Sequence, residues 1–486
     1  MKPTNLKVFN TLSKQKEKFT PQEEGQVKIY VCGVTPYNQP HIGNARPFIF
    51  WDVVRRYLEY LGYKVYHVQN FTDIDDKIIK TAKDENTSWQ TITNRYIAAY
   101  FEVMDKLGVR RAHNYPKVSE HIDDIIELVK GLVQKGYAYR TSDGSVYFSV
   151  DKFSSYGKLS GRSIDDMQNV ARVESDEEKR HPMDFALWKA AKPDEASWKS
   201  PWGNGRPGWH IECSAMSNKY LGFGFDFHGG GSDLIFPHHE NEIAQSEAYA
   251  GCEPFVRYWL HNGFVTVDEE KMSKSLGNFF LITDILKHFS PEVLRFFILS
   301  THYRSQLDFS NDRLEEAGKA LERLKTAMRN LERLQSLPSK EAFTADAAAL
   351  LEGANTARSE FFTAMDDDFN TSLAIGHMFN LAKEINIYYQ KTLSETFAAD
   401  TKTITTAAET YTVMANILGI LNEPLLERSS SQTDNLVAGL MDLIIAIRQD
   451  ARAKKDWQTS DDIRGKLSAI GIVLEDSPQG ATWKKQ

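Results

Sequence analysis

The chain of 486 residues is 41% apolar and 26% charged, which is typical of a soluble globular protein and excludes a disordered chain, a collagen-like repeat and a coiled-coil rod. At about 150 residues per domain, this length predicts roughly three domains. Its 58 Lys and Arg stand against 66 Asp and Glu, a formal charge of −8 that by itself argues mildly against a nucleic-acid partner.

The three cysteines, Cys32, Cys213 and Cys252, are too few and too scattered for a disulfide framework, so a reducing compartment fits better. The first ten residues hold no apolar run of the kind found in signal peptides. No apolar run approaches the roughly 18 residues of a membrane span. We therefore expect a soluble, cytoplasmic protein that does not bind membranes.

The first part of the chain predicts a βαβ unit. The β-branched run at 26–34 predicts a buried strand, segment 48–63 has apolar residues at helical spacing, and 64–71 predicts the next strand. A strand, a helix and a second strand in this order favour parallel pairing.

The middle of the chain changes in character from about Tyr115 to Gly205, where helical segments alternate with polar loops and short strands such as 145–150. This alternation predicts an insertion between two halves of the sheet domain. The second half contains a predicted strand at 223–231 that runs into a glycine loop. Pro237 then opens a helix, because proline suits the first helical position.

Beyond Pro291 the pattern is almost wholly helical, with a break at 336–340 and a predicted linker from Asn422 to Asp434. The predicted fold class is α/β: a split Rossmann-like parallel-sheet domain with an inserted α+β connective domain, followed by an all-α bundle and a small C-terminal unit. The predicted boundaries are 1–114 and 206–300 for the two halves of the sheet domain, 115–205 for the insertion, 301–335 for connecting helices, 336–421 for the bundle and 435–486 for the C-terminal unit.

The first candidate motif is His41-Ile42-Gly43-Asn44, between the first predicted strand and its helix. Ligands of open α/β sheets bind at this end of the strands. A helix N-terminus offers free N–H groups and a positive dipole end, which suit a phosphate, and Gly43 allows a backbone or a flat base to come close. A histidine that merely caps the helix is the alternative.

The second motif is Lys271-Met272-Ser273-Lys274-Ser275. Two lysines three residues apart, on a loop with small hydroxyl residues, form a cationic clamp. Such a clamp suits phosphoryl or adenylyl transfer, in which negative charge develops on phosphate oxygens. A solvated basic loop is the common alternative, although the unbroken pentapeptide is much more specific than that.

The third candidate site combines Cys32, Cys213, His238, His239 and Glu242. Glu242 follows His238 by four residues and His239 by three, so either histidine can share its helix face. Two thiolates, one imidazole and one carboxylate form a reasonable tetrahedral zinc set. Two buried thiols beside an ordinary polar helix face are the alternative.

These motifs resemble those of the class I aminoacyl-tRNA synthetases, and the sequence around them narrows the resemblance to the cysteinyl-tRNA synthetases. It covers essentially the whole chain. The segments that carry it are CGVTPYNQPHIGNARPF (32–48), NFTDIDDKI (70–78), RPGWHIECSAM (206–216), FHGGGSDLIFPHHENEIAQSEA (227–248), KMSKSLGNF (271–279), HYRSQLDFS (302–310), MDDDFNTSLA (365–374) and the stretch 455–483.

The resemblance implies one zinc ion per chain, which takes the thiolate of the substrate cysteine as a further ligand. Because a serine hydroxyl is a poor soft ligand, such a pocket can discriminate without an editing domain. The implied zinc ligands are Cys32, Cys213, His238 and Glu242, and the implied amino-acid pocket is lined by Thr72, Trp209, His228 and Asp233.

The resemblance also implies a two-step reaction. The cysteine carboxylate attacks the α-phosphate of ATP, with Mg²⁺ neutralising the phosphates, and cysteine then passes to the 2′-hydroxyl of the terminal ribose of tRNA(Cys). Asn44 stands where the family signature has a second histidine, and its amide can still donate a hydrogen bond. The implied ATP contacts are His41, Gly43, Asn44 and Lys274, and the implied catalytic residues are His41, Asn44, Lys271 and Lys274.

For tRNA, the resemblance assigns 301–335 to helices that contact the stem and 435–486 to anticodon binding, and we expect a monomer. One candidate basic face is formed by Lys319, Arg323, Arg329 and Arg333, and the candidate stacking groups are Trp457 and Trp483. A solvated helix face is the alternative for each.

Three other functions compete with this one. A ligase that passes cysteine to an aminosugar would lack the C-terminal region. A non-catalytic RNA-binding paralogue has no reason to keep an ATP clamp. A zinc hydrolase that uses HHENE explains neither KMSKS nor the tail.

Overall fold

A computed structural model describes residues 4–162, 178–192, 195–267, 270–271, 280–338, 343–392, 399–421, 425–469, 472–477 and 480–485. The chain divides into two compact units, Met1–Asn422 and Glu423–Gln486. Among the described residues, no helix is long and apolar enough to cross a membrane.

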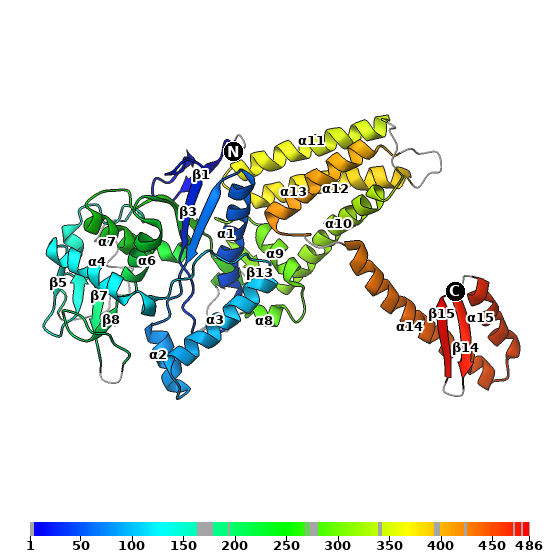
Figure 1. The fold of residues 1–486 in the computed structure, drawn as a ribbon, viewed down its shortest axis with the longest axis horizontal. Helices are drawn as coiled ribbons and strands as arrows, with labels where there is room; N and C mark the ends of the chain where they lie inside the picture. The colour runs from blue at the N-terminus through cyan, green and yellow to red at the C-terminus, as the bar shows by residue number, and fades with distance from the viewer. Residues whose placement is uncertain are drawn as a thin grey trace. The chain divides into compact units, whose positions relative to one another are not determined.

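The first unit is built on a four-stranded parallel sheet in the order β10-β9-β3-β4 (Figure 1). β3 (Gln26–Val31) pairs with β4 (Lys64–Gln69) on one side and with β9 (Phe225–Gly231) on the other, and β10 (Val256–Asn262) pairs with β9. The predicted parallel sheet is confirmed. Because β3 and β9 come from the two halves of the split domain, their pairing joins those halves at the centre of the sheet.

α1 (Ile42–Tyr60) is the crossover between β3 and β4. Its apolar face packs on the sheet through fully buried side chains such as Ile49, Val53 and Tyr57. Trp51 also lies against the sheet, with its ring 6.2 Å from that of Phe227 on β9. This packing fixes the N-terminal end of α1, where the first motif lies.

The predicted insertion contains a separate antiparallel sheet in the order β5-β6-β7-β8. Its apolar residues share one core with α4 and with the helices of the second half of the sheet domain. The elements of the insertion are α4 (Ile122–Gln134), β5 (Ala138–Arg140), β6 (Val146–Phe148) and β7 (Phe185–Ala190), and β8 (Gly205–Pro207) begins at its end. The first half of the sheet domain also contains α2 (Asp76–Asp84) and α3 (Trp89–Lys106), and the second half contains α6 (Ile211–Leu221) and α7 (Glu240–Ala250).

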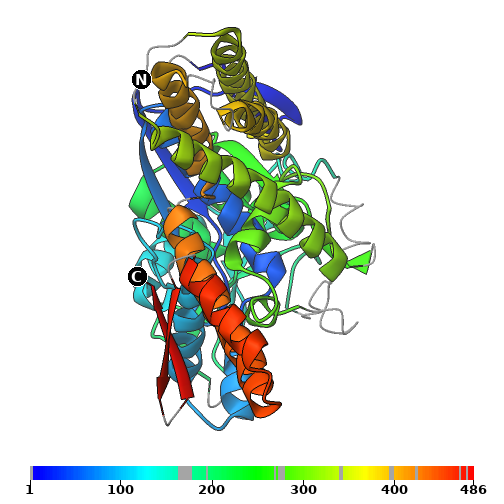
Figure 2. The same ribbon diagram turned by 90° about the vertical axis from the view of Figure 1, so that its right-hand side faces the viewer.

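Three long helices fall in the predicted bundle at 336–421, and α10 (Asn311–Gln335), from the region predicted separately at 301–335, packs against two of them, as Figures 1 and 2 show. The three helices are α11 (Ala345–Asp366), α12 (Thr371–Thr392) and α13 (Thr401–Leu418). The remaining elements of this unit are β1 (Lys7–Asn10), β2 (Gln15–Lys18), β11 (Val265–Val267), β12 (Glu270–Lys271), α8 (Ile282–Ile285), α9 (Pro291–Leu299) and β13 (Leu307–Phe309).

The C-terminal unit contains α14 (Leu425–Ala453), α15 (Trp457–Ala469) and an antiparallel pair, β14 (Ile472–Ser477) and β15 (Gly480–Lys485). The linker predicted from Asn422 to Asp434 is wrong from Leu425 on, because that stretch is the start of α14. After Pro424 the sequence has no proline or glycine before Gly439, so nothing in the serine-rich run stops a helix.

Candidate active site

The candidate site lies where the carboxyl ends of β3 and β9 meet, the position at which open α/β sheets bind ligands. Cys32 follows β3 directly, and the glycines that end β9 lie beside it. The N–H of Cys32 donates to the carbonyl of Gly229 over 3.2 Å. Next to it, a Cβ on Gly33 would lie 1.6 Å from the carbonyl oxygen of Asn70, so only glycine allows the ends of β3 and β4 to approach this closely.

The structure brings the four predicted zinc ligands together in a buried cluster. The Sγ of Cys32 lies 3.7 Å from the Sγ of Cys213 and 3.7 Å from Oε1 of Glu242. His238 Nε2 lies 3.0 Å from the same Oε1. Around a tetrahedral zinc ion, two sulfurs at about 2.3 Å from the metal are separated by about 3.8 Å, so the thiol spacing fits the metal.

Three elements supply this cluster. Cys213 lies on α6, and His238 and Glu242 lie at the start of the α7 segment. Phe236 is extended (φ −139°, ψ 131°), and the helical conformation begins again at Pro237, where the sequence predicted a helix to open. The side chains at 238 and 242 therefore lie one turn apart and point to the same face.

The geometry also allows a second set of four donors, Cys32, His228, His239 and Glu242, whose ligand atoms lie within 4.8 Å of one another. His239 Nε2 is 3.3 Å from Cys32 Sγ, while its Nδ1 hydrogen-bonds to His261 over 2.7 Å. Both histidines of the HH pair therefore contact the cluster. Only the set with His238 contains both thiols.

A ring of further histidines surrounds the cluster. His228, predicted in the amino-acid pocket, is fully buried, lies 2.8 Å from Oε2 of Glu242 and stacks on Trp259. His210 Nδ1 lies 3.0 Å from His238 Nδ1. His210 and His261 were not predicted from the sequence. Two signals could have indicated them: His210 lies one helical turn before Cys213, and His261 is a polar residue near the end of the apolar strand β10.

The pKa values show mutual stabilisation of charge within the cluster. Burial alone would raise the pKa of Glu242, but His228 and His238 lower it to about 2. Burial alone would lower the pKa of His238, but Glu242 and Cys213 raise it to about 10. A hydrogen bond with Cys32, assisted by His238, lowers the pKa of Cys213 to about 6. Burial, Cys213 and Glu242 raise the pKa of the Cys32 thiol, so the four donors do not all favour the deprotonated form. A bound cation would favour deprotonation of both thiols.

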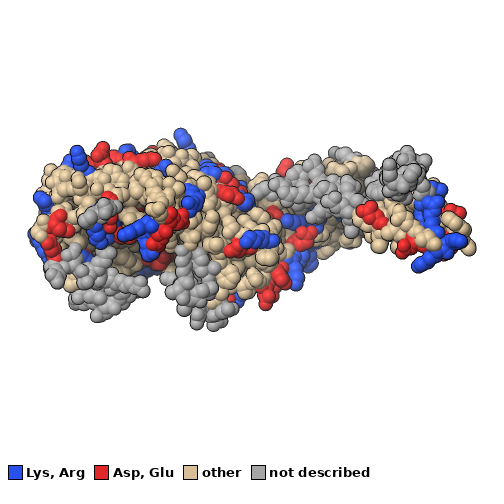
Figure 3. All heavy atoms as spheres, turned by 90° about the horizontal axis from the view of Figure 1, so that it is seen from below, with Lys and Arg blue, Asp and Glu red and all other residues tan. Residues whose placement is uncertain are grey.

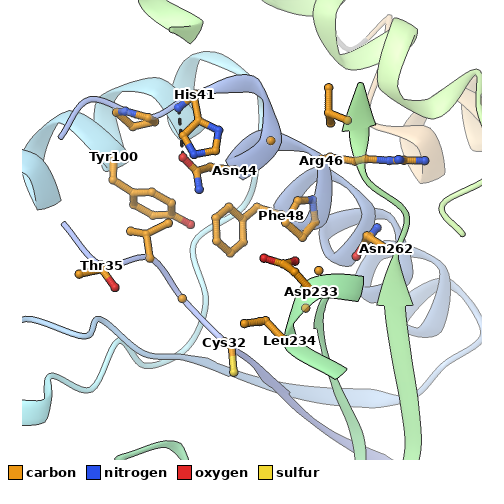
Figure 4. Close-up of a pocket in the computed structure, with 18 of the residues that line it drawn as sticks. Cys32, Thr35, His41, Asn44, Arg46, Phe48, Tyr100, Asp233, Leu234 and Asn262 are labelled. Atoms are coloured by element: carbon orange, nitrogen blue, oxygen red, sulfur yellow. Dashed lines mark hydrogen bonds between the residues drawn. The ribbon is translucent and has the colours of Figure 1, made fainter. Parts of the chain in front are cut away.

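A pocket of about 370 Å³ opens beside the cluster, and Cys32 belongs to both (Figure 4). His41 and Asn44 line one wall, and Asp233 lines the wall beyond the end of β9. Within the described part of the chain, the exposed carboxylate of Asp233 forms no hydrogen bond or ion pair with another side chain, so it is open to a ligand from the pocket.

The first motif forms the N-terminus of α1, as predicted. The backbone N–H of His41 donates to Oδ1 of Asn44 over 3.1 Å, and the N–H of Asn44 donates to the carbonyl of His41 over 2.8 Å. Since Oδ1 is the acceptor, the amide nitrogen of Asn44 is left on the pocket side (Figure 4). Asn44 therefore both caps the helix and presents a donor.

The other predicted pocket residues are more dispersed. Thr72 is buried, and its hydroxyl donates to Glu212 over 3.1 Å. Trp209 is 43% exposed, stacks on His238 with ring centroids 4.4 Å apart, and lines a separate pocket of about 270 Å³. The structure thus places Trp209 against the cluster and Asp233 in the larger pocket.

The second motif follows β12, whose residue Lys271 pairs through its backbone with Thr266 on β11. Val265, also on β11, lines the larger pocket. The motif therefore begins beside this pocket. Lys274 and the other residues of 272–279 lie outside the described residues, as does the side chain of Lys271.

The fold is that of the class I aminoacyl-tRNA synthetases. Among solved structures, methionyl-tRNA synthetase of Mycobacterium tuberculosis in complex with methionyl-adenylate has a TM-score of 0.61 at 16% identity, covering 81% of this chain and 90% of that one. A ternary LeuRS-tRNA-LeuAMS complex of Agrobacterium radiobacter has a TM-score of 0.59 at 12% identity, covering 82% and 85%. These likenesses support the fold.

Sequence comparison gives the particular family. The catalytic domain of class I (C) tRNA synthetases matches residues 18–319, a DALR domain matches 360–422, and the cysteinyl-tRNA ligase anticodon binding domain matches 441–483. The cysteine–tRNA ligase of Desulforamulus reducens is 56% identical, covering 99% of this chain and 100% of the relative. That of Pelotomaculum thermopropionicum is 55% identical with the same coverage. The chain belongs to the cysteine–tRNA ligase family, enzymes that charge tRNA with cysteine.

Proposed function

We propose that the chain activates L-cysteine with ATP to cysteinyl-adenylate and transfers cysteine to tRNA(Cys), with selectivity from a zinc-bound substrate thiolate. The observation that carries this proposal is the position of Cys32, which belongs both to the four-donor cluster and to the wall of the larger pocket. A substrate whose thiol reaches the cluster can therefore extend its carboxylate toward the start of α1.

One zinc ion per chain is proposed on Cys32, Cys213, His238 and Glu242, whose spacing suits a tetrahedral metal. When bound, zinc supplies a Lewis acid that favours a thiolate over a hydroxyl ligand. The chain's own residues hold that set in place. His228 Nε2 donates to Oε2 of Glu242, the oxygen that does not contact Cys32 or His238, and so fixes the orientation of the carboxylate.

The remaining residues of the amino-acid pocket have distinct proposed roles. The open carboxylate of Asp233 suits the α-ammonium group of the amino acid. Thr72 and Trp209 are proposed to line the pocket, with the indole of Trp209 as a wall that already contacts His238.

In the first step, a carboxylate oxygen of cysteine attacks the α-phosphorus of ATP, and the bond to pyrophosphate breaks. Negative charge that develops on the phosphate oxygens is stabilised by His41, the amide of Asn44, Lys271 and Lys274, with Mg²⁺ neutralising the other phosphates. Gly43 allows the nucleotide to approach the helix end. In the second step, the 2′-hydroxyl of the terminal ribose attacks the carbonyl carbon, and AMP leaves.

The tRNA partner is proposed to contact the C-terminal unit and α10. On the C-terminal unit, Figure 3 shows Lys and Arg side chains gathered at one end. The exposed cations of this unit include Lys454, Lys455, Arg464 and Lys466. On α10, three of the predicted cations are already engaged: Arg323 lies over Phe379, Arg329 pairs with Glu322, and Arg333 lies over Tyr389. We also propose a cytoplasmic monomer.

The first experiment is ATP–pyrophosphate exchange on the zinc-loaded chain, followed by aminoacylation of a tRNA mixture. Exchange with cysteine is expected to exceed exchange with serine by roughly 10,000-fold, because the site binds a group that serine lacks. Equal exchange with serine, or exchange with neither, contradicts the proposal. Exchange without tRNA charging favours the aminosugar ligase.

A further inference from the structure

The larger pocket is lined by few positively charged side chains, although ATP and the 3′ end of tRNA both bring phosphates to it. Besides His41, its described cationic lining residues are Arg46 and Lys77. Arg46 is buried and already bound to backbone carbonyls. Its Nη1 donates to Gly263 and Phe264 over 2.8 and 2.9 Å, and its Nη2 donates to His302 over 3.1 Å. Backbone carbonyls therefore engage both terminal nitrogens of Arg46, and among its donors only the buried Nε lacks a hydrogen-bond partner in the described part of the chain.

Lys77 is different, because its ammonium is held only weakly. It is exposed at the start of α2, and its Nζ lies 5.3 Å from the ring centroid of Tyr37, which also lines the pocket. An exposed cation–π contact is weak beside an ammonium–phosphate contact. The ring can thus hold the ammonium at the pocket and release it to a phosphate.

The carboxylates next to Lys77 are used by other groups. Asp75 caps α2 by accepting the backbone N–H of Lys77 over 2.8 Å. Asp76 forms ion pairs with Arg206 and with Lys189, the latter at 3.7 Å. Within the part of the chain that the structure describes, no carboxylate forms an ion pair with Lys77, so its charge is available to a ligand.

Lys77 also belongs to a different structural element from the two sequence motifs of the site. His41 and Asn44 belong to the N-terminus of α1, and the KMSKS motif begins from the β11–β12 hairpin. Lys77 lies on α2, which is joined to neither. A phosphate in this pocket would therefore be contacted by Lys77 from a different element than the one that carries His41 and Asn44.

We propose that Lys77 is a phosphate-binding residue of this site, seated on the ring of Tyr37 until substrate arrives. This inference rests on the proposed function. The phosphate belongs either to ATP or to the 3′ end of tRNA, and the two sources are separable because pyrophosphate exchange needs no tRNA.

The test compares Lys77→Ala, Lys77→Arg and the matched control Lys83→Ala on the zinc-loaded full chain. Lys83 lies on the exposed last turn of the same helix and does not line the pocket. If ATP is the source, Lys77→Ala raises KM for ATP in exchange about tenfold and leaves KM for cysteine unchanged. If tRNA is the source, exchange is unchanged and KM for tRNA in aminoacylation rises about tenfold. Lys77→Arg restores most of either loss.

A Lys77→Ala enzyme that matches wild type in both assays overturns the proposal, and so does an equal loss in Lys83→Ala. Zinc content and the thermal midpoint of each variant establish that it is folded. Tyr37→Phe, which keeps the ring, is expected to behave as wild type, whereas Tyr37→Ala shifts the same KM in the same direction as Lys77→Ala. Failure of the wild-type enzyme to exchange with cysteine would instead contradict the proposed function.

Discussion

The four-donor cluster and the larger pocket meet at Cys32, yet they are built in opposite ways. Every donor of the cluster is buried and comes from a strand end or a helix, and three of the four contact a surrounding histidine: Cys32 contacts His239, His238 contacts His210, and Glu242 contacts His228. Many polar groups of the pocket lie on a helix N-terminus, on loops and on α2, and two of them, Lys77 and Asp233, are exposed. The four-donor cluster is therefore shielded from solvent before substrate binds, whereas the larger pocket is open to solvent.

This difference matches what each region has to do. Selecting a thiolate over a hydroxyl depends on fixed ligand distances, which regular elements hold better than loops. A phosphate site has to admit ATP and release pyrophosphate, so its cations come from separate elements that can approach and withdraw. The predictions below test this division.

The largest expected effect follows from Cys213→Ser, which removes one thiolate from the four-donor cluster. We expect zinc content to fall, measured by elemental analysis, and cysteine-dependent exchange to drop by roughly three orders of magnitude. Cys252→Ser is the control, because that cysteine is exposed and free. Unchanged zinc content in Cys213→Ser would refute the ligand assignment.

On the open side, Lys274→Ala is expected to lower kcat for exchange by roughly 100- to 1,000-fold, because it removes a cation from the transition state. Zinc content and KM for cysteine should not change. Lys287→Ala, at an exposed lysine paired with Asp284, serves as the control. A loss of zinc in Lys274→Ala would break the proposed division between the two regions.

His228→Phe tests whether the second layer acts through the metal. It leaves Oε2 of Glu242 without its partner at 2.8 Å. We expect zinc affinity to weaken by about 10- to 100-fold, measured by competition with a chelator. At saturating zinc, activity should largely return, and His228→Gln should lose less. An activity loss that saturating zinc leaves unchanged would instead favour direct contact of His228 with cysteine.

Asn44 carries the smallest expected effect. Asn44→Ala removes the acceptor of the His41 N–H and is expected to lower the free energy of unfolding by about 1 kcal/mol, measured by denaturant titration. Asn44→Asp keeps that acceptor, so stability should match wild type while exchange falls, because a carboxylate repels the phosphates. If Asn44→Asp exchanged normally, Asn44 would be a cap alone.

Much of the fold follows from local patterns. The strands at 26–34, 64–71 and 223–231 were predicted from short β-branched or aromatic runs, and all three lie in the parallel sheet. The linker prediction failed because a serine-rich run is only mildly unfavourable in a helix, and the chain after Leu425 has no strong helix breaker. The composition of the serine-rich run shows that it is polar, but it does not determine whether its backbone is helical or irregular.

The candidate site was predicted less evenly. The spacing of His238 and Glu242 predicted a shared helix face, which the structure confirms. The spacing could not predict that His228 contacts Oε2 of Glu242, because His228 lies on β9 and Glu242 on α7, and only the tertiary structure brings these two elements together. The sequence grouped Trp209 and Asp233 in one amino-acid pocket. No local pattern predicted that Trp209 stacks on His238 of the cluster whereas Asp233 lines the larger pocket.

The sequence by itself determined which chemistry is available: two thiols, a histidine and a carboxylate at helical spacing, a phosphate-binding helix start and a paired-lysine motif. Those properties follow from residue type and from the regular geometry of single elements. Only the tertiary structure decided that Cys32 and Cys213, far apart in the chain, lie 3.7 Å apart, and that Cys32 also lines the pocket of about 370 Å³. Such distances arise from the pairing of β3 with β9, a contact between two halves of the chain that no local pattern encodes.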